Sequence, residues 1–328
     1  ESERRDTDAQ PGYATLHPTD AVVAGSVGTW QVVYIAGAMG IAPGGGVVLA
    51  RPWPADWGQP QWADPTGRDY TTFSTTGPCR LTPHFERMQA GLAWNPGAIH
   101  ALFVHVHDQA LRPGDRITVT LGDTRAGSPG QLAQTFTEEE SRLVVAVDVH
   151  GDGQWRPLPS LPGLRVVGGP ACRLVVIAPS LVTVGEPFEV TLRAEDRWGN
   201  PAPDYRGRVL LEVEGRIGAE RPFDAGDAGL ARLACRLTHA GVHRLRAVDA
   251  AGALEATGNP IVCAERRPAL RLFWGDLHGQ SQMGCGARTV ESFLRYARDV
   301  AGVDFAAEQA NDHYLSQEKW RETQRVVR

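Results

Sequence analysis

Residues 116–130 read Arg-Ile-Thr-Val-Thr-Leu-Gly-Asp-Thr-Arg-Ala-Gly-Ser-Pro-Gly, a short apolar run followed directly by residues that favour turns. No stretch with a helical period separates this turn from the Pro-Gly-Asp turn at residues 113–115. Similar apolar runs, separated by Gly, Pro, Asp and Asn, recur at residues 29–35, 46–50, 99–106 and 142–149. An irregular segment rich in Trp and Pro interrupts them at residues 51–70. The sequence therefore predicts a β-sandwich-like domain over residues 1–165.

A second β unit follows a proline-rich segment and is predicted over residues 166–265. Its apolar or alternating runs have the spacing of antiparallel sandwich strands and lie at residues 173–177, 188–194, 208–213, 231–237 and 243–248. The turn Asp-Arg-Trp-Gly-Asn-Pro at residues 196–201 and the sequence His-Ala-Gly-Val-His at residues 239–243 resemble bacterial immunoglobulin-like modules. This resemblance implies an immunoglobulin-like β-sandwich and carries no implication for catalysis.

The pattern changes from strands alone to alternating strands and helices over residues 266–328. Three alternating apolar residues predict a strand: Leu270, Leu272 and Trp274. Apolar residues at helical spacing then predict an amphipathic helix: Val290, Phe293, Leu294, Ala297 and Ala301. Residues 303–307 predict a second strand, and Ser316 precedes a further predicted helix. We therefore expect the first two βα units of a parallel α/β sheet or barrel, in a multi-domain chain that begins with two β-sandwiches.

Composition limits the classes of partner. The chain has 328 residues, 42% of them hydrophobic, which is enough for about two to three domains with a core each. A net charge of −5 and an isoelectric point near 6.1 give no broad basic field, so we expect no nucleic-acid partner. Gly and Pro break the apolar residues 21–50 every few positions, so we expect no membrane partner. The absence of a Gly-rich phosphate-binding motif indicates no nucleotide cofactor.

The cysteines and the N-terminus bear on the cellular compartment. Five cysteines are widely spaced and contain no Cys-x-x-Cys pair, which predicts reduced thiols rather than a disulfide framework or a zinc knuckle. The chain begins at Glu1 and shows no charged segment followed by an apolar one, so we expect a cytoplasmic location.

The stretch most typical of a catalytic or metal site is residues 272–285, Leu-Phe-Trp-Gly-Asp-Leu-His-Gly-Gln-Ser-Gln-Met-Gly-Cys. Three polar residues follow the first predicted strand of the α/β part: Asp276, His278 and Gln280. Three more follow the second: Glu308, Asp312 and His313. Because the loops after parallel strands converge at one edge of the sheet, we expect these side chains to meet there. Histidine and carboxylate on adjacent strand ends favour a divalent metal site.

These motifs resemble the opening of a PHP (polymerase and histidinol phosphatase) metal hydrolase. The resemblance rests on the Gly-Asp-Leu-His turn at residues 275–278, on residues 296–299 and 303–305, and on Asp312-His313. Upstream segments resemble a branch of large proteins in which β-rich domains precede such a domain: residues 56–61, 122–123 and 198–201. The resemblance implies a distorted β/α barrel that binds zinc, manganese or iron and hydrolyses a phosphoester or another small molecule.

The resemblance also implies roles for single residues. His278 and His313 correspond to metal ligands, Glu308 to an oxygen donor, and Asp276 and Asp312 to carboxylates that orient the histidines or bridge to the metal. Gln280 stands where the family has a second histidine and would donate a hydrogen bond to the substrate. Because only two βα units are present, we expect no hydrolytic activity from these 328 residues alone.

A second interpretation is a non-catalytic binding or structural protein built on β-sandwich modules, with a degenerate PHP-like part. The missing second histidine favours it. His105 and His107 are predicted to face outward from a strand whose Val104 and Val106 face the core, so we interpret them as surface residues rather than zinc ligands. The acidic residues 138–140 are interpreted as solvated surface. The sequence leaves the oligomeric state open.

Overall fold

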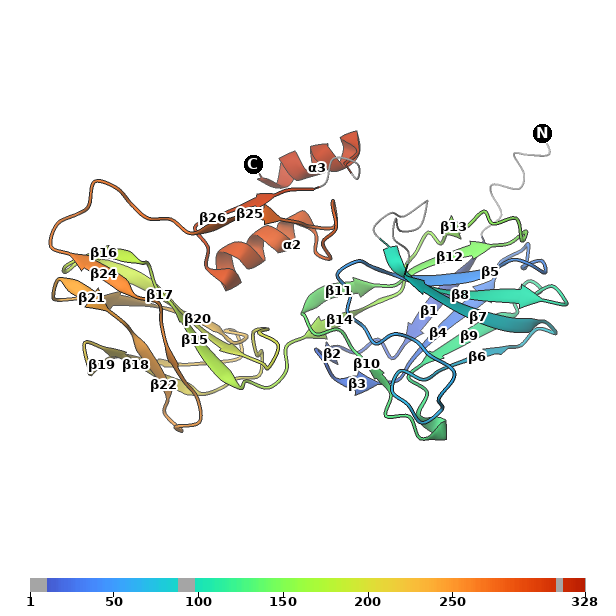
Figure 1. Ribbon diagram of the computed structural model, residues 1–328, viewed down its shortest axis with the longest axis horizontal. Helices are drawn as coiled ribbons and strands as arrows, with labels where there is room; N and C mark the ends of the chain where they lie inside the picture. Colours follow the sequence, from blue (N-terminus) through green and yellow to red (C-terminus); the bar gives the residue numbers. More distant parts are fainter. Residues whose placement is uncertain (1–10, 88–97, 311–314, 328) are drawn as a thin grey trace. The chain divides into compact units, whose positions relative to one another are not determined.

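The computed structural model describes residues 11–87, 98–310 and 315–327. The chain divides into two compact units, and in the β-rich part the boundary falls between Val166 and Val167. Strands dominate both units (Figure 1). No helix in the described ranges is long and apolar enough to cross a membrane.

Two antiparallel sheets share the core of the N-terminal unit. One has the order β1-β4-β9-β6, with bounds Gly12–His17, Trp30–Ala36, Arg116–Leu121 and Thr71–Thr75. The other has the order β13-β12-β5-β8-β7, with bounds Arg156–Pro157, Val144–Asp148, Gly46–Pro52, Ala98–His107 and Arg80–Arg87. Shorter elements complete the unit: β2 Val22–Val23, β3 Val27–Gly28, the 3-10 turn η1 Thr124–Ala126, β10 Gln131–Leu132, β11 Glu138–Arg142 and β14 Gly163–Val167.

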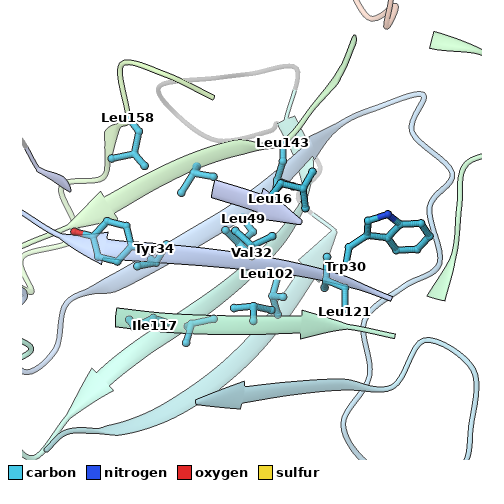
Figure 2. Close-up of a cluster of buried hydrophobic side chains, with 14 of the residues drawn as sticks. Leu16, Trp30, Val32, Tyr34, Leu49, Leu102, Ile117, Leu121, Leu143 and Leu158 are labelled. Carbon is cyan, nitrogen blue, oxygen red and sulfur yellow. The ribbon is translucent and has the colours of Figure 1, made fainter. Parts of the chain in front are cut away.

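Strand alternation builds the core between these sheets. On β4 every second side chain is buried, from Trp30 through Val32 to Tyr34, and Figure 2 shows them beside Leu49 of β5 and Leu102 of β8. Each such side chain contributes about 1.5–3 kcal/mol relative to an exposed one. The predicted β-sandwich is therefore confirmed in its general form.

Three sheets form the strand-rich part of the second unit. Their orders are β15-β17-β20, β16-β24-β21 and β19-β18-β22-β23. In chain order the strands are β15 Arg173–Ile177, β16 Leu181–Thr183, β17 Pro187–Glu195, β18 Arg208–Val213, β19 Arg216–Pro222, β20 Leu230–Arg236, β21 Gly241–His243, β22 Arg246–Asp249, β23 Glu255–Thr257 and β24 Ile261–Ala264. Their buried faces enclose a core that includes Leu192, Leu211 and Leu245.

The turn after β17 is closed by one carboxylate. Asp196 is 2% exposed and accepts hydrogen bonds from the backbone N–H groups of Gly169, Trp198 and Asn200 at 2.8–2.9 Å. The Asn200 side-chain amide donates to it at 3.0 Å. The Asp-Arg-Trp-Gly-Asn-Pro sequence thus has a structural role, because its aspartate satisfies donors that the turn would otherwise bury unpaired.

The C-terminal residues contain strands and helices in alternation. β25 Gly275–Gly279 pairs in parallel with β26 Phe305–Glu308, and the helices are α2 Val290–Arg295, the π-helical turn η2 Tyr296–Ala301, and α3 Gln317–Val327. The strand predicted from Leu270, Leu272 and Trp274 is wrong, since these side chains are 85%, 54% and 60% exposed and the strand begins at Gly275. The described residues form no α/β barrel, so the predicted barrel opening is not supported.

Candidate functional site

The paired parallel strands carry predicted site residues at different levels: Asp276 lies near the start of β25 opposite Ala306, and Glu308 ends β26. The β25–β26 register places Gly279 beside Glu308. The Asp276 carboxylate accepts a hydrogen bond from the backbone N–H of His278 at 2.8 Å, and Glu308 Oε1 accepts one from the Ser281 N–H at 3.2 Å. Glu308 Oε2 is buried and has no hydrogen-bond partner within the described ranges.

The rest of the predicted metal site is not assembled by the described residues. Gln280 directly follows β25, whereas Asp312 and His313 lie outside the described residues. Among the residues that the structure describes, no three His, Cys, Asp or Glu side chains are grouped to hold a metal ion. The zinc, manganese or iron site stays a prediction.

A cavity inside the N-terminal unit is the stronger candidate site. It has a volume of about 190 Å³. Side chains from both sheets and the segment after β11 form its apolar wall: Leu49, Phe85, Leu102, Leu121 and Leu143. The loop that follows β5 supplies another side, with Asp56 and Trp57. Cavities with apolar walls and a few polar groups are the usual form of small-molecule sites.

A positive charge lies in this cavity against an aromatic ring. The guanidinium carbon of Arg51 lies 4.0 Å from the ring centroid of Trp57, a cation–π contact. Burial lowers the pKa of Arg51 to about 9, and the nearby Glu138 carboxylate offsets part of this effect. No hydrogen bond or ion pair joins this guanidinium to any part of the chain that the structure describes. The charge is therefore partly withdrawn from water without a direct anionic partner.

Trp57 is fixed by a buried polar network. It is 9% exposed, meets Trp30 edge-on at 5.0 Å between ring centroids, and donates from Nε1 to Gln134 Oε1 at 2.8 Å. Gln134 donates in turn to Glu138 at 3.0 Å and accepts from Ser141 at 3.2 Å. Glu138 is 7% exposed, so the interpretation of residues 138–140 as solvated surface is wrong at this position. The network holds the Trp57 ring in place beneath Arg51.

Gln131 lines the cavity and has one buried side-chain acceptor without a partner in the described residues. Its side chain is 2% exposed and donates from Nε2 to the Gly58 carbonyl at 2.7 Å, which fixes the orientation of the amide. Gly58 is itself held by a hydrogen bond from its N–H to the Leu132 carbonyl at 2.9 Å. Gln131 Oε1 is buried and accepts no hydrogen bond from the described residues. Such an orphaned acceptor typically costs about 1–3 kcal/mol.

Two further basic residues, Arg87 and His100, line the cavity. Burial is the main cause that lowers the pKa of His100, and the charges of Arg87 and Arg51 lower it further against a weak contact to the Trp53 carbonyl. Asp56 also lines the cavity, and its carboxylate accepts hydrogen bonds from Thr135 at 2.6 and 2.9 Å. The polar lining is therefore basic in balance.

We expect an NMR titration to give His100 a pKa below its ordinary 6.5, and Arg87→Gln to raise that pKa. Because the folded value is depressed, the unfolded chain binds more protons just below pH 6.5. The contribution of His100 to stability is therefore fully present above that pH and is lost as the pH falls. Arg112→Gln, at an exposed arginine outside the cavity lining, is the control. An equal His100 pKa in both variants would contradict the placement of Arg87.

Relatives of this chain occur among chlamydial proteins. An uncharacterized protein of Chlamydia muridarum (strain MoPn / Nigg) is 26% identical over 235 residues, which cover 69% of this chain and 37% of that protein. An uncharacterized protein of Chlamydia trachomatis serovar D is 26% identical over 234 residues, with the same shares of both chains. This chain thus spans little more than a third of the length of these curated relatives.

Solved structures with some likeness include domains of intimin and of BspA. The D00-D0 domain of intimin has a TM-score of 0.28 and 10% identity, covering 77% of this chain and 100% of that one. The C-terminal domain of the Streptococcus agalactiae AgI/II polypeptide BspA has the same TM-score, identity and shares. No family model matches the chain.

The resemblance to PHP metal hydrolases is therefore corrected. No family model matches, strands far outnumber helices in the described chain, and the parallel pair β25–β26 stands alone as a two-stranded sheet that does not extend to a barrel. The β-sandwich modules fit the non-catalytic alternative better than the hydrolase. The motif at residues 275–278 misled because these residues form strand β25 itself rather than a turn after a strand.

Sequence reasoning missed the cavity in the N-terminal unit. Arg51 lies next to the end of β5, where a charged side chain is expected to face solvent. Gln131 lies in a segment rich in turn-forming residues. One signal was present: the Trp- and Pro-rich residues 51–70 interrupt a regular strand pattern. Long irregular loops on a rigid scaffold commonly carry binding residues, and this loop supplies Trp57.

Proposed function

We propose that this chain is a non-catalytic binding protein whose N-terminal β-sandwich holds a small anionic molecule in the Arg51 cavity. The observation that carries the proposal is the Arg51 guanidinium, stacked on Trp57 inside the cavity and without an ion pair to the described residues. A small-molecule partner agrees with the cavity volume of about 190 Å³.

The energetic argument concerns the cost of a partly buried charge. Removing a guanidinium from water is unfavourable unless an anion or hydrogen bonds compensate it. The folded chain already bears this cost, because the Trp57 network fixes the site before a ligand arrives. An anion that enters gains charge-assisted hydrogen bonds in a water-poor setting, where they are stronger than at the surface.

The composition of the lining favours binding over catalysis. Its titratable side chains are Arg51, Asp56, Arg87 and His100, and the Asp56 carboxylate is engaged by Thr135. None of the described lining residues is a Ser, Thr or Cys that an adjacent base would activate. The described lining therefore offers no hydroxyl or thiol nucleophile beside a general base.

The test is calorimetric titration of the full chain with 3-phenylpropanoate and with inorganic phosphate. Arg51→Met keeps an apolar stem over Trp57 and removes the charge, so we expect affinity to fall at least about 30-fold, as for a buried charge pair that loses one member. Arg165→Ala removes an exposed arginine of the same unit and should leave affinity unchanged. Binding of neither anion to the wild-type chain, or equal affinity in Arg51→Met, would overturn the proposal.

A further inference from the structure

We propose that a groove beside strand β16 in the second unit binds an extended acidic peptide of a partner protein, which adds to the free edge of β16 as a further strand. Three features carry this proposal: backbone groups of β16 without a partner, a groove that runs past them, and two arginines without a counter-charge. The groove lies in a different unit from the Arg51 cavity, so neither site depends on the ligand of the other.

Strand β16 is an edge strand with backbone groups that no described residue uses. In its three-stranded sheet it pairs in parallel with β24, on one side only (Figure 1). The Ser180 carbonyl and the Val184 N–H both bond to β24, at 2.9 Å. Because alternate residues of a strand bond to opposite sides, the backbone groups of Leu181 and Thr183 point away from β24. No described residue bonds to the N–H or C=O of Leu181 or to the N–H of Thr183. These three groups are the ones that a further strand would pair with.

A groove of about 920 Å³ runs past this free edge. Its lining includes Val182, which faces the sandwich core, and also Leu181 and Thr183, which alternation turns the other way. None of the residues of β24 lines it. A space that adjoins both faces of β16 but not β24 lies at the edge of β16 opposite its partner strand. The volume is near the upper end of the roughly 300–1,000 Å³ of ligand pockets, so the groove has room for a segment of chain rather than a single ion.

A second wall of the groove is an irregular segment that is tied to the sandwich. Trp274 donates from Nε1 to the Ser180 hydroxyl at 2.9 Å, and its backbone N–H and C=O bond to Asp304 at 2.8 and 2.7 Å. Leu272 and Phe273 also line the groove and are 54% and 53% exposed. Large apolar side chains that line a groove and remain exposed favour an apolar stretch in the occupant.

The groove carries more free positive than free negative charge. Arg267 and Arg271 line it, are exposed, and form no ion pair with any described residue. The other two arginines of the lining are each paired with an acid. Two of the three acidic lining residues are engaged, Glu189 by an arginine at 3.4 Å and Asp304 by the N–H of residue 274, which leaves Glu186. A glutamate or aspartate of the peptide therefore restores the balance of charge.

The test is an NMR titration of the full chain with the hexapeptide acetyl-Val-Glu-Val-Glu-Val-Thr-amide. Main-chain pairing tolerates many side chains, so we expect this glutamate peptide to bind saturably with a Kd below about 1 mM. Hydrogen exchange of the Leu181 and Thr183 amides should slow at least about ten-fold at saturation, because both become donors in a ladder. The glutamine peptide acetyl-Val-Gln-Val-Gln-Val-Thr-amide should bind about three- to five-fold more weakly, a modest loss because both free arginines are exposed.

Matched variants separate the strand edge from the charges. Thr183→Pro removes the outward N–H and keeps the bonds to β24, so it should weaken the glutamate peptide at least about five-fold. Thr183→Val keeps that N–H and should leave the affinity unchanged. Arg271→Gln should weaken the glutamate peptide about three-fold, and Arg216→Gln, at an exposed arginine outside the groove, is its control. Protection of the two amides in the wild-type chain decides strand addition even if Thr183→Pro does not fold.

Each contrary outcome overturns a stated part of the proposal. No saturable binding of the glutamate peptide up to about 1 mM overturns the whole. Binding without protection of the Leu181 and Thr183 amides overturns strand addition, and equal affinity for the glutamine peptide overturns the acidic class. A concentration-dependent dimer in sedimentation that Thr183→Pro dissociates would assign the edge to a second copy of this chain instead of a partner peptide.

Discussion

Replacing Gly122 with alanine is expected to lower the free energy of unfolding of the N-terminal unit by about 4 kcal/mol or to prevent its folding. Gly122 has a φ of +69°, and a Cβ there would lie 2.1 Å from the Gln131 nitrogen and 2.4 Å from the Gly28 oxygen. Both atoms belong to the backbone of the paired strands β10 and β3. The Gly122 carbonyl also accepts a hydrogen bond from Thr29 at 2.6 Å, so the turn cannot move away freely.

The matched control is Gly114→Ala. Gly114 has a similar φ of +82°, but a Cβ there would meet nothing within 4 Å. Its substitution therefore tests backbone conformation alone and should cost about 1–2 kcal/mol. Urea denaturation with hydrogen-exchange readout on peptides from β4 and β9 measures both variants in the full chain. A cost for Gly122→Ala no larger than for Gly114→Ala would show that the strands yield to the added methyl group.

Replacing Glu195 with alanine is expected to destabilise the second unit by about 3–5 kcal/mol. Glu195 is 1% exposed, and its carboxylate lies 2.6 Å from Arg173 Nη2 and 2.7 Å from Arg193 Nη2. The Arg193 side chain is 15% exposed and also donates to the Val300 carbonyl. Removing the carboxylate leaves this largely buried guanidinium without its counter-charge, which is the costly half of a broken buried pair.

Two variants separate the effect of the Glu195 charge from that of its exposed contact with Arg173. Arg173→Ala removes the partner that is 54% exposed, and we expect a loss of no more than about 1 kcal/mol. Glu195→Gln keeps the shape and loses the charge, so its cost should fall between the other two. Hydrogen exchange of peptides from β17 and β20 follows the local stability. If Arg173→Ala proved as damaging as Glu195→Ala, the buried pair with Arg193 would not be the dominant contact.

The sequence predicted single strands better than it predicted their partners. The run at residues 116–121 coincides with β9. A strand of this kind is predictable because the alternation of apolar and polar residues can be seen in neighbouring positions of the sequence. The short strands β2 and β3 and the turn that joins Gly122 to Gln131 depend on backbone contacts between distant segments. The alternation of Leu270, Leu272 and Trp274 predicted a strand that does not form, since the parallel ladder begins only at Gly275.

The candidate site was largely hidden for the same reason. Arg51 and Trp57 are close in sequence, but the ring is held by Gln134, which lies 77 residues after Trp57. Nothing local marks Glu138 as buried within an acidic run. The parallel pairing of β25 and β26 follows from the helix between them, but Asp276 lies near the start of β25 rather than after its strand, so it does not meet Glu308 at one edge. The family suggested for that motif was wrong.

The edge-on pair of Trp30 and Trp57, at 5.0 Å and 87° between the ring planes, has an optical consequence. Two indoles at this separation couple their ultraviolet transitions, and the sign and strength of the resulting near-ultraviolet circular dichroism depend on their mutual tilt. Trp30 is anchored in β4, whereas Trp57 belongs to the cavity loop and touches Arg51 on its face. Because the chain has nine tryptophans, the part of the spectrum that Trp57→Phe removes reports this pair, and with it the position of the loop, without any added label.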